Sequence, residues 1–189
     1  MQVTSRKRQI SRPARQRLTW VCVLVLLGLT ATAQPAAQSA SAVQQGAMKK
    51  LAFMAGRWSG PITITEEHGA PLQLTQTEDV QYKLDGLLLL VEGKSTDAGG
   101  KTAFSALAVI SYDDATQAYR IRAYHDGRYV DAELKVLADG FSWGFPAGPV
   151  QVTNTMRLNS KGEWQETTDV QFGSNPPQRS VAMLLKHLE

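Results

Sequence analysis

The stretch LAFMAGRWSG, residues 51–60, decides the fold. A short apolar run ends at Gly56, and Trp58 opens a segment in which apolar and polar residues alternate. Glycine lets the chain enter a strand sharply, because it adopts backbone angles that other residues avoid. A tryptophan at the start of that strand carries a ring large enough to cover the end of a barrel. The stretch therefore predicts one or two helical turns within residues 48–55, followed by the first strand of a β-sheet domain.

The chain that follows reads as a succession of short strands. Val, Ile, Thr and aromatic residues gather in short runs, and clusters of Gly, Pro, Asn and Asp separate these runs. The Asp-Gly pairs at residues 85–86, 126–127 and 139–140 suit tight hairpins, because glycine accepts a positive φ. Strands are expected near residues 58–66, 72–84, 87–95, 102–113, 118–125, 128–136, 140–145, 150–159, 163–172 and 178–187.

The order of these strands predicts the architecture. About ten strands joined by short hairpins form an up-and-down meander. With few helices to cover a sheet edge, closure into a barrel is the arrangement that removes the edges. We therefore expect an all-β fold, a closed up-and-down antiparallel barrel of about ten strands with a short N-terminal helix. This β-barrel domain is expected to span residues 49–189.

The N-terminal region predicts export. Residues 1–33 begin with a basic segment, continue with an apolar run at residues 20–29 and end in Ala31-Thr32-Ala33, a pattern typical of a cleaved signal peptide. The apolar run is shorter than the roughly 20 residues that span a bilayer, so we expect no stable membrane insertion after cleavage. Residues 34–48 are rich in Ala, Gln and Ser and are expected to form a flexible tether. The predicted location is secreted or periplasmic.

Charge excludes one class of partner. The whole chain has 20 Lys+Arg and 17 Asp+Glu, and the predicted signal peptide holds six of the bases and none of the acids. The remaining chain therefore carries 14 bases and 17 acids, a net charge of −3. Without a basic stripe, a nucleic-acid partner is not expected. The single cysteine, Cys22, leaves with the signal peptide, so no disulfide is expected.

Several short motifs resemble a known superfamily. The pattern Leu51-x-Phe53-x-x-Gly56-x-Trp58 resembles the Gly-x-Trp signature of the first strand in lipocalins and other calycins. Together with the segments at residues 124–127 and 177–183, it is most similar to secreted bacterial proteins of unknown function related to nitrobindin-like barrels. The resemblance covers about residues 49–187. It implies a barrel that binds a small hydrophobic or amphipathic ligand.

The same resemblance implies how the barrel closes. In calycins a basic residue of the last strand packs over the tryptophan of the Gly-x-Trp motif. In this chain Lys186 is the nearest match, where the family prefers arginine. Gly56, Trp58 and Lys186 are therefore expected to close the barrel, with a structural role.

No set of residues predicts catalysis. Nucleophilic catalysis needs a base beside the nucleophile, and the mature chain has no cysteine. The carboxylate pairs Glu166 and Asp169, and Glu66 and Glu67, are expected to lie on solvated faces, because charged residues seldom lie inside unpaired. We therefore expect a protein that is not an enzyme.

Metal binding is not expected, and haem remains an alternative. None of His68, His125 and His187 has a second ligand-type residue at a metal-binding spacing. Nitrobindin-like barrels hold haem through a single histidine late in the chain, so the resemblance makes His187 a weak candidate. His125, beside a predicted turn, is the other.

The candidate ligand-binding residues lie in the middle of the chain. Arg120, Arg122 and Tyr124 alternate along one predicted strand and so share one face. If that face is inward, two guanidinium groups and a phenol meet an anionic head group. If it is outward, Ile121 faces the interior and the arginines are surface cations. Six aromatic residues are further candidates for lining a pocket, namely Tyr82, Phe104, Tyr112, Trp143, Phe145 and Trp164.

Three functions remain open at the level of sequence. The first is a non-enzymatic barrel that binds a small hydrophobic or amphipathic molecule in a cavity of roughly 300–1,000 Å³. The second is a barrel that handles haem or nitric oxide. The third is a structural or interaction module whose interior is filled by its own side chains.

Overall fold

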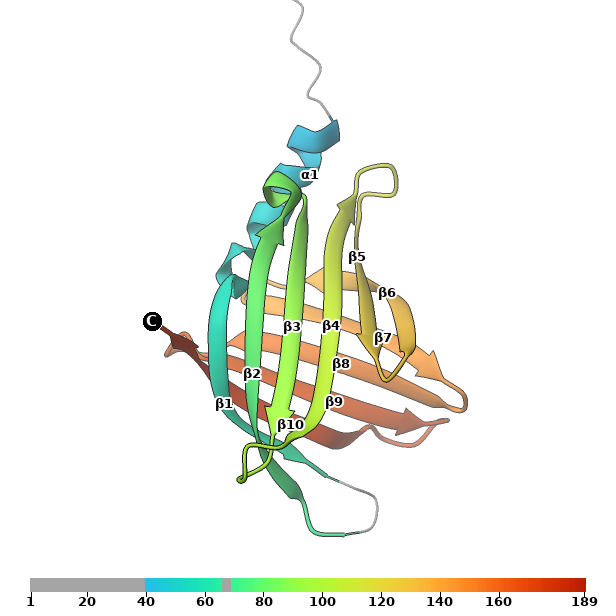
Figure 1. Ribbon diagram of the computed structural model, residues 1–189. Coiled ribbons are helices and arrows are strands. Elements are labelled where there is room, and N and C mark those ends of the chain that lie inside the picture. Colours follow the sequence, from blue (N-terminus) through green and yellow to red (C-terminus); the bar gives the residue numbers. More distant parts are fainter. Residues whose placement is uncertain (1–39, 66–68) are drawn as a thin grey trace, which may run out of the picture. The chain divides into compact units, whose positions relative to one another are not determined.

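The computed structural model describes residues 40–65 and 69–189. Ten antiparallel strands form a closed barrel, and two short helices precede it (Figure 1). The elements are α1 (Ala40–Met48), η1 (Lys49–Met54), β1 (Gly56–Ile64), β2 (Leu72–Lys83), η2 (Leu84–Gly86), β3 (Leu88–Thr96), β4 (Thr102–Asp113), β5 (Ala118–His125), β6 (Arg128–Val136), β7 (Gly140–Ala147), β8 (Val150–Leu158), β9 (Trp164–Phe172) and β10 (Gln178–Leu188). The expected fold class is confirmed.

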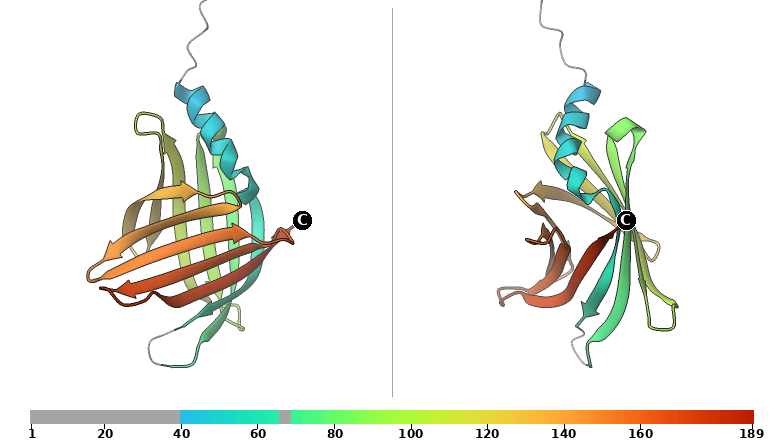
Figure 2. Two further views of the ribbon diagram at one scale, coloured as in Figure 1. Left: turned by 180° about the vertical axis from the view of Figure 1, so that it is seen from behind. Right: turned by 90° about the vertical axis from the view of Figure 1, so that its left-hand side faces the viewer.

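Each strand pairs with its neighbours in sequence, and β10 closes the barrel by pairing with β1. Strands β7–β10 run across the direction of β2–β4 on the opposite wall, so the two walls enclose an interior (Figures 1 and 2). The hairpins follow from the turn residues. Asp126 and Gly127, between β5 and β6, both have positive φ values of 48° and 69°. A two-residue turn with two positive φ values matches the right-handed twist of the flanking strands.

The segment expected to be a flexible tether is helical from Ala40 onward. Tyr82 Oη donates a hydrogen bond of 2.8 Å to the Met48 carbonyl oxygen, and Tyr119 Oη donates one of 2.7 Å to that of Ala47. The last carbonyls of a helix have no partner within the helix, so these hydroxyl groups fix α1 to the barrel. The expectation of a tether is therefore wrong for residues 40–48.

Two further expectations for the N-terminal region lie outside the described residues. These are the signal peptide at residues 1–33 and the tether at residues 34–39. Among the helices of residues 40–65 and 69–189, none has the length and apolar character needed to cross a bilayer.

The hydrophobic core fills one end of the barrel. Met48, Leu51 and Met54 from α1 and η1 are almost fully buried there. They pack against inward-facing side chains that lie near the same end of their strands, namely Trp58, Val80, Leu89, Ile110, Ile121, Leu134, Phe141, Met156, Trp164 and Leu185. The helices thus close this end, and the interior beyond the core layer is left to form a cavity.

Candidate functional site

A cavity of about 690 Å³ occupies the barrel interior beyond the core layer. Side chains from all ten strands line it. Its walls are mostly apolar, and Met54, Phe141 and Trp164 of the core layer form part of its lining. This volume is typical of small-molecule sites, which fall in the range of roughly 300–1,000 Å³. Of the residues described, those around this cavity form the candidate site.

One polar patch of the cavity comes from β2 and β3. Gln76 Nε2 donates a hydrogen bond of 2.7 Å to Oε1 of Glu78, and Ser95 Oγ donates one to Oε1 of Gln76. The Glu78 side chain is buried, with 8 % of its surface exposed. Its register partner on β3 is Gly93, where an added Cβ would lie 2.9 Å from both carboxyl oxygens. The missing side chain at residue 93 is therefore what leaves room for this carboxyl group.

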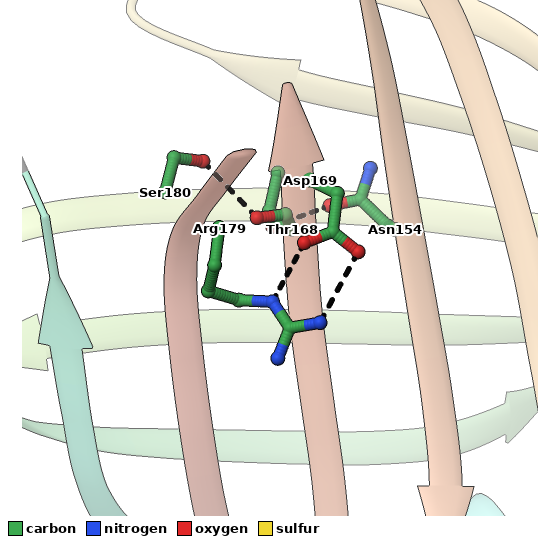
Figure 3. A network of polar contacts seen from close by, with 5 residues as sticks. All are labelled: Asn154, Thr168, Asp169, Arg179 and Ser180. Atoms are coloured by element: carbon green, nitrogen blue, oxygen red, sulfur yellow. Dashed lines mark hydrogen bonds and ion pairs between the residues drawn. The ribbon is translucent and has the colours of Figure 1, made fainter. Parts of the chain in front are cut away.

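A second polar patch comes from β8 and β9. Trp164 Nε1 donates a hydrogen bond of 2.8 Å to Oε2 of Glu166. Thr168 Oγ1 donates one of 2.7 Å to Oδ1 of Asn154 (Figure 3). Asn154 is buried, and its Nδ2 donates no hydrogen bond to a residue that the structure describes. Its amide nitrogen is thus available to a molecule in the cavity.

The outer face of the same wall carries a separate contact. Arg179 of β10 forms an ion pair with Asp169 of β9, with Nε 2.6 Å from Oδ1 (Figure 3). Ser180 lies at an irregularity in the β9–β10 register, and its hydroxyl donates a hydrogen bond of 3.2 Å to the Thr168 carbonyl oxygen. These contacts tie β9 to β10 and hold the inner residues of β9 in place.

Both interior carboxyl groups have raised pKa values. Burial, together with a smaller effect of the nearby charge of Glu166, raises the pKa of Glu78 to about 8, although the Gln76 hydrogen bond opposes this shift. Burial also raises the pKa of Glu166 to about 7, although the Trp164 hydrogen bond opposes this shift. In the described part of the chain, neither carboxyl group has a cationic partner within ion-pair distance. The cavity therefore favours their neutral form until a positive charge enters.

The mouth of the cavity is aromatic. Phe104, Tyr124 and Tyr129 line the cavity and are also exposed to solvent, with 37 %, 40 % and 60 % of their surface accessible. The rings of Phe104 and His125 stack with their centroids 4.1 Å apart. Arg128 lies at the same mouth. This end of the barrel is therefore open, in contrast to the end that α1 and η1 close.

Strand β5 has its arginines on the outer face. Ile121 is 4 % exposed and Ala123 lines the cavity, so Arg120 and Arg122 point away from it. Arg122 instead forms an ion pair with Asp131, with Nε 2.7 Å from Oδ1. Of the two alternatives for this strand the outward one is present, because the apolar Ile121 occupies the interior. The anion-binding arrangement of two inward arginines is thus absent from this strand.

The other candidate ligand-binding residues take different positions. Tyr124 reaches the cavity mouth at the end of β5. Trp143 lines the cavity and stacks on Phe145, with ring centroids 5.7 Å apart. Tyr82 is not among the lining residues of the cavity, because its hydroxyl group binds the end of α1. The structure therefore brings Tyr124 and Trp143, but not Tyr82, to the candidate site.

Trp58 lies at the closed end, and His187 packs over it. The Trp58 ring is 4 % exposed, and its Nε1 donates a hydrogen bond of 2.8 Å to the Met54 carbonyl oxygen. The His187 ring meets the Trp58 ring edge-on, with centroids 4.8 Å apart. Lys186 points outward with 75 % of its side chain exposed, whereas the buried Leu185 and the solvent-exposed His187 share the other face of β10. The expected closing contact of Lys186 is therefore made by His187.

Gly56 gives His187 its space. Gly56 has a φ of 122°, a conformation that side chains disfavour. An added Cβ there would lie 2.2 Å from Nε2 of His187. The absence of a side chain at residue 56 thus leaves room for the His187 ring. His187 is not among the residues that line the cavity.

Of the two carboxylate pairs named from sequence, the described pair, Glu166 and Asp169, does not lie together on a solvated face. Glu166 lines the cavity, so the expectation that it is solvated is wrong, whereas Asp169 lies on the outer face. Glu66 and Glu67 lie outside the described residues, as does His68. No group of three or more His, Cys, Asp or Glu side chains in the described ranges is placed to hold a metal ion.

Sequence reasoning missed Glu78 and Asn154 as interior residues. The signal for Glu78 was its parity, since it shares the parity of Leu74 and Val80, which are buried. Glu166 likewise shares the parity of Trp164. In a strand, residues two apart share a face, so a residue that needs burial marks its polar neighbours as inward.

The comparisons with known proteins support the barrel fold and assign no function. Neither a scan of protein-family models nor a search of curated proteins found a match to the chain. Among solved structures, Rv2717c from M. tuberculosis matches with a TM-score of 0.58 and 14 % sequence identity, over 76 % of this chain and 98 % of that one. At this identity the similarity shows a shared barrel fold alone.

Proposed function

We propose that this protein is an exported, calycin-like carrier that binds a small amphipathic molecule inside its barrel and performs no chemistry on it. The observation that carries the proposal is the cavity of about 690 Å³, whose mostly apolar walls hold a few converging polar groups. Pockets of this kind bury most of a small ligand and fix its orientation through those groups. A barrel that served only as a structural module has no need of such a space.

The arrangement of the two ends supports the same proposal. The helices and Trp58 close one end, while exposed aromatic side chains surround the other. A ligand can enter only where the interior meets solvent, and exposed aromatic surface next to a cavity is typical of a binding site. We propose this mouth as the entry route.

The test uses the fluorescent probe N-phenyl-1-naphthylamine, whose emission rises in apolar surroundings. We expect saturable binding to the wild-type barrel. In the variant Ala108→Phe the signal should fall at least tenfold, because Ala108 lines the cavity. Overpacking destabilises by about 1–3 kcal/mol, so folding of the variant is checked by circular dichroism.

The matched control is Arg120→Ala. Arg120 is exposed and points away from the cavity, so probe binding should be unchanged. Native mass spectrometry of protein from its source supplies a second readout, in which a co-purifying small molecule is expected. Absence of both probe binding and a co-purifying molecule would overturn the proposal.

A second candidate function is haem binding through His125. This histidine lines the cavity mouth, and its Nδ1 lies 2.8 Å from the Ser105 carbonyl oxygen. A carbonyl oxygen only accepts, so Nδ1 carries the proton and Nε2 is left as the potential iron ligand. Added haemin should then give a Soret band that His125→Ala shifts or removes. A spectrum that is the same in both proteins would exclude this candidate.

A further inference from the structure

We propose that the ligand of this cavity is a cationic amphiphile, a protonated amine with an apolar body, whose ammonium group lies between Glu78 and Glu166. The inference rests on the proposed function and names the chemical class that the cavity selects. It follows from three observations: the oxygens that the two carboxyl groups leave unused, the missing cation around them, and the apolar space beside them.

Each carboxyl group has one oxygen engaged within the protein and one left over. Gln76 binds Oε1 of Glu78, and Trp164 binds Oε2 of Glu166. The remaining oxygens accept no hydrogen bond from the residues that the structure describes. Both glutamates line the cavity, so these oxygens are open to its contents. An ammonium group has three donors and no acceptor, which suits acceptors approaching from two walls.

The surroundings supply no positive charge. Glu78 pairs in register with Trp58 on β1 and Gly93 on β3. Glu166 pairs with Met156 on β8 and Met183 on β10. None of these four neighbours is charged.

The other charged or titratable side chains that line the cavity lie at its mouth, in the β5–β6 hairpin. They are Tyr124, His125, Asp126, Arg128 and Tyr129. The only positive charge of the described protein near the cavity is therefore remote from the closed end where the glutamates lie.

A cation that enters the cavity shifts both carboxyl groups from their protonated form toward their ionised form. An unpaired buried carboxylate is unfavourable, and such a group takes up a proton instead. The raised pKa values of Glu78 and Glu166 agree with this state. A nearby ammonium favours the ionised form, so binding of an amine near neutral pH should release protons. An anionic head group, in contrast, meets no cation there and further disfavours the ionised form of both carboxyl groups.

Two further groups extend the site around the ammonium group. The indole of Trp164 lines the cavity beside Glu166, and its aromatic face attracts a cation. Nδ2 of Asn154 offers a donor to a hydroxyl or carbonyl oxygen of the same molecule. The apolar side chains of β4 and β5, such as Ala108 and Ala123, face the interior and suit the ligand's body.

The experiment compares three ligands with the same ten-carbon chain. Decylammonium, 1-decanol and decanoate are each used to displace N-phenyl-1-naphthylamine at pH 7.5. We expect decylammonium to bind at least about 10-fold more tightly than 1-decanol, as for a charge-assisted hydrogen bond. Decanoate should bind more weakly than 1-decanol. Decylammonium binding should also release protons, which calorimetry in buffers of different ionisation enthalpy measures.

Substitutions of Glu78 and Glu166 then test whether their carboxyl groups cause the preference for decylammonium. In Glu78→Gln/Glu166→Gln the advantage of decylammonium over 1-decanol should fall to less than about 3-fold, while 1-decanol binding is retained. Proton release should disappear as well. The matched control is Glu92→Gln on β3, because Glu92 is exposed and faces outward. This variant should keep the wild-type preference.

The outcomes separate this inference from the proposed function. If all three ligands bind with equal affinity, or decanoate binds best, the cationic preference is wrong and the amphiphile-binding barrel stands. If the wild-type preference persists in the double variant, these two glutamates are not its source, and the inference fails. If neither the probe nor any ligand binds, the proposed function itself fails.

Discussion

Glu78 and Gly93 face one another across the β2–β3 pair, and the carboxyl group of the first lies over the bare Cα of the second. A Cβ at residue 93 would lie 2.9 Å from both carboxyl oxygens and 3.1 Å from Nε2 of Gln76. A glycine within a strand normally weakens it. Here it permits a buried carboxyl group to lie flat against the wall of the cavity.

Gly93→Ala should therefore disturb Glu78. The added methyl group displaces the carboxyl group and breaks its hydrogen bond from Gln76, so we expect the free energy of unfolding to fall by about 1 kcal/mol. Chemical denaturation measures this change. In a Glu78→Ala background the same substitution should have little effect or stabilise the strand, because the two closest contacts, with the carboxyl oxygens of Glu78, are gone. An equal loss in both backgrounds would show that the methyl group clashes with something else.

His187→Ala should destabilise the closed end of the barrel. The variant loses the edge-on contact with the Trp58 ring, which we expect to lower the free energy of unfolding by about 1 kcal/mol. Lys186→Ala is the matched control on the same strand and should change it by less than about 0.5 kcal/mol. Thermal or urea denaturation of both variants under the same conditions measures this difference in the free energy of unfolding. A larger loss of stability in Lys186→Ala than in His187→Ala would show that Lys186, and not His187, closes this end of the barrel.

The stability of the protein should fall between about pH 5 and pH 8. The pKa of Glu78 is raised from 4.5 to about 8, and that of Glu166 from 4.5 to about 7. Over this window the folded protein binds more protons than the unfolded chain, so the free energy of unfolding decreases as pH rises. We expect a loss of at least about 1 kcal/mol, measured by urea denaturation at several pH values.

The control for this pH dependence is Glu78→Gln/Glu166→Gln, in which the slope between pH 5 and 8 should flatten. Hydrogen bonds lower the pKa values of Asp113 and Asp131 in the folded protein. These two groups therefore stabilise the fold at pH values above their unfolded pKa, and this contribution is lost as the pH falls through their folded pKa. These two aspartates therefore change the stability at a lower pH than Glu78 and Glu166 do. A slope that survives the double substitution would place its origin outside the cavity.

Tyr82→Phe and Tyr119→Phe should loosen α1. Each variant removes one hydroxyl group that binds a carbonyl oxygen at the end of the helix, so we expect a loss of about 1 kcal/mol per substitution. Hydrogen exchange of the α1 amide groups should become faster. Tyr129→Phe is the control, because Tyr129 lies at the opposite end of the barrel and its ring is largely exposed. Unchanged exchange in both test variants would mean that burial of Met48 alone holds the helix.

Much of the fold could be predicted from sequence because its signals are local. Strand β5 ends at an Asp-Gly pair, and the predicted bounds of residues 118–125 match those of the structure. The helix α1 could not be predicted, because its sequence of Ala, Gln and Ser carries little apolar pattern. Tyr82 and Tyr119, far along the chain, provide its anchoring hydrogen bonds.

The candidate site was harder to predict for a related reason. Alternation shows which residues share a face, but it does not say which face is inward when both carry polar residues. For β5 the burial of Ile121 settles the question and turns Arg120 and Arg122 outward. For β9 the burial of Trp164 places Glu166 inside, against the usual preference of a carboxylate for solvent.

The sequence by itself determined a meander of ten antiparallel strands, since period-two alternation and turn residues act over a few positions of the chain. Only the tertiary structure decided that Glu78 and Glu166 share one cavity. These residues are far apart in sequence, and they meet because β10 pairs with β1 and thereby brings β2 and β9 around a common interior. Closure of a sheet is a long-range event, and the burial that raises their pKa values exists only once it has happened.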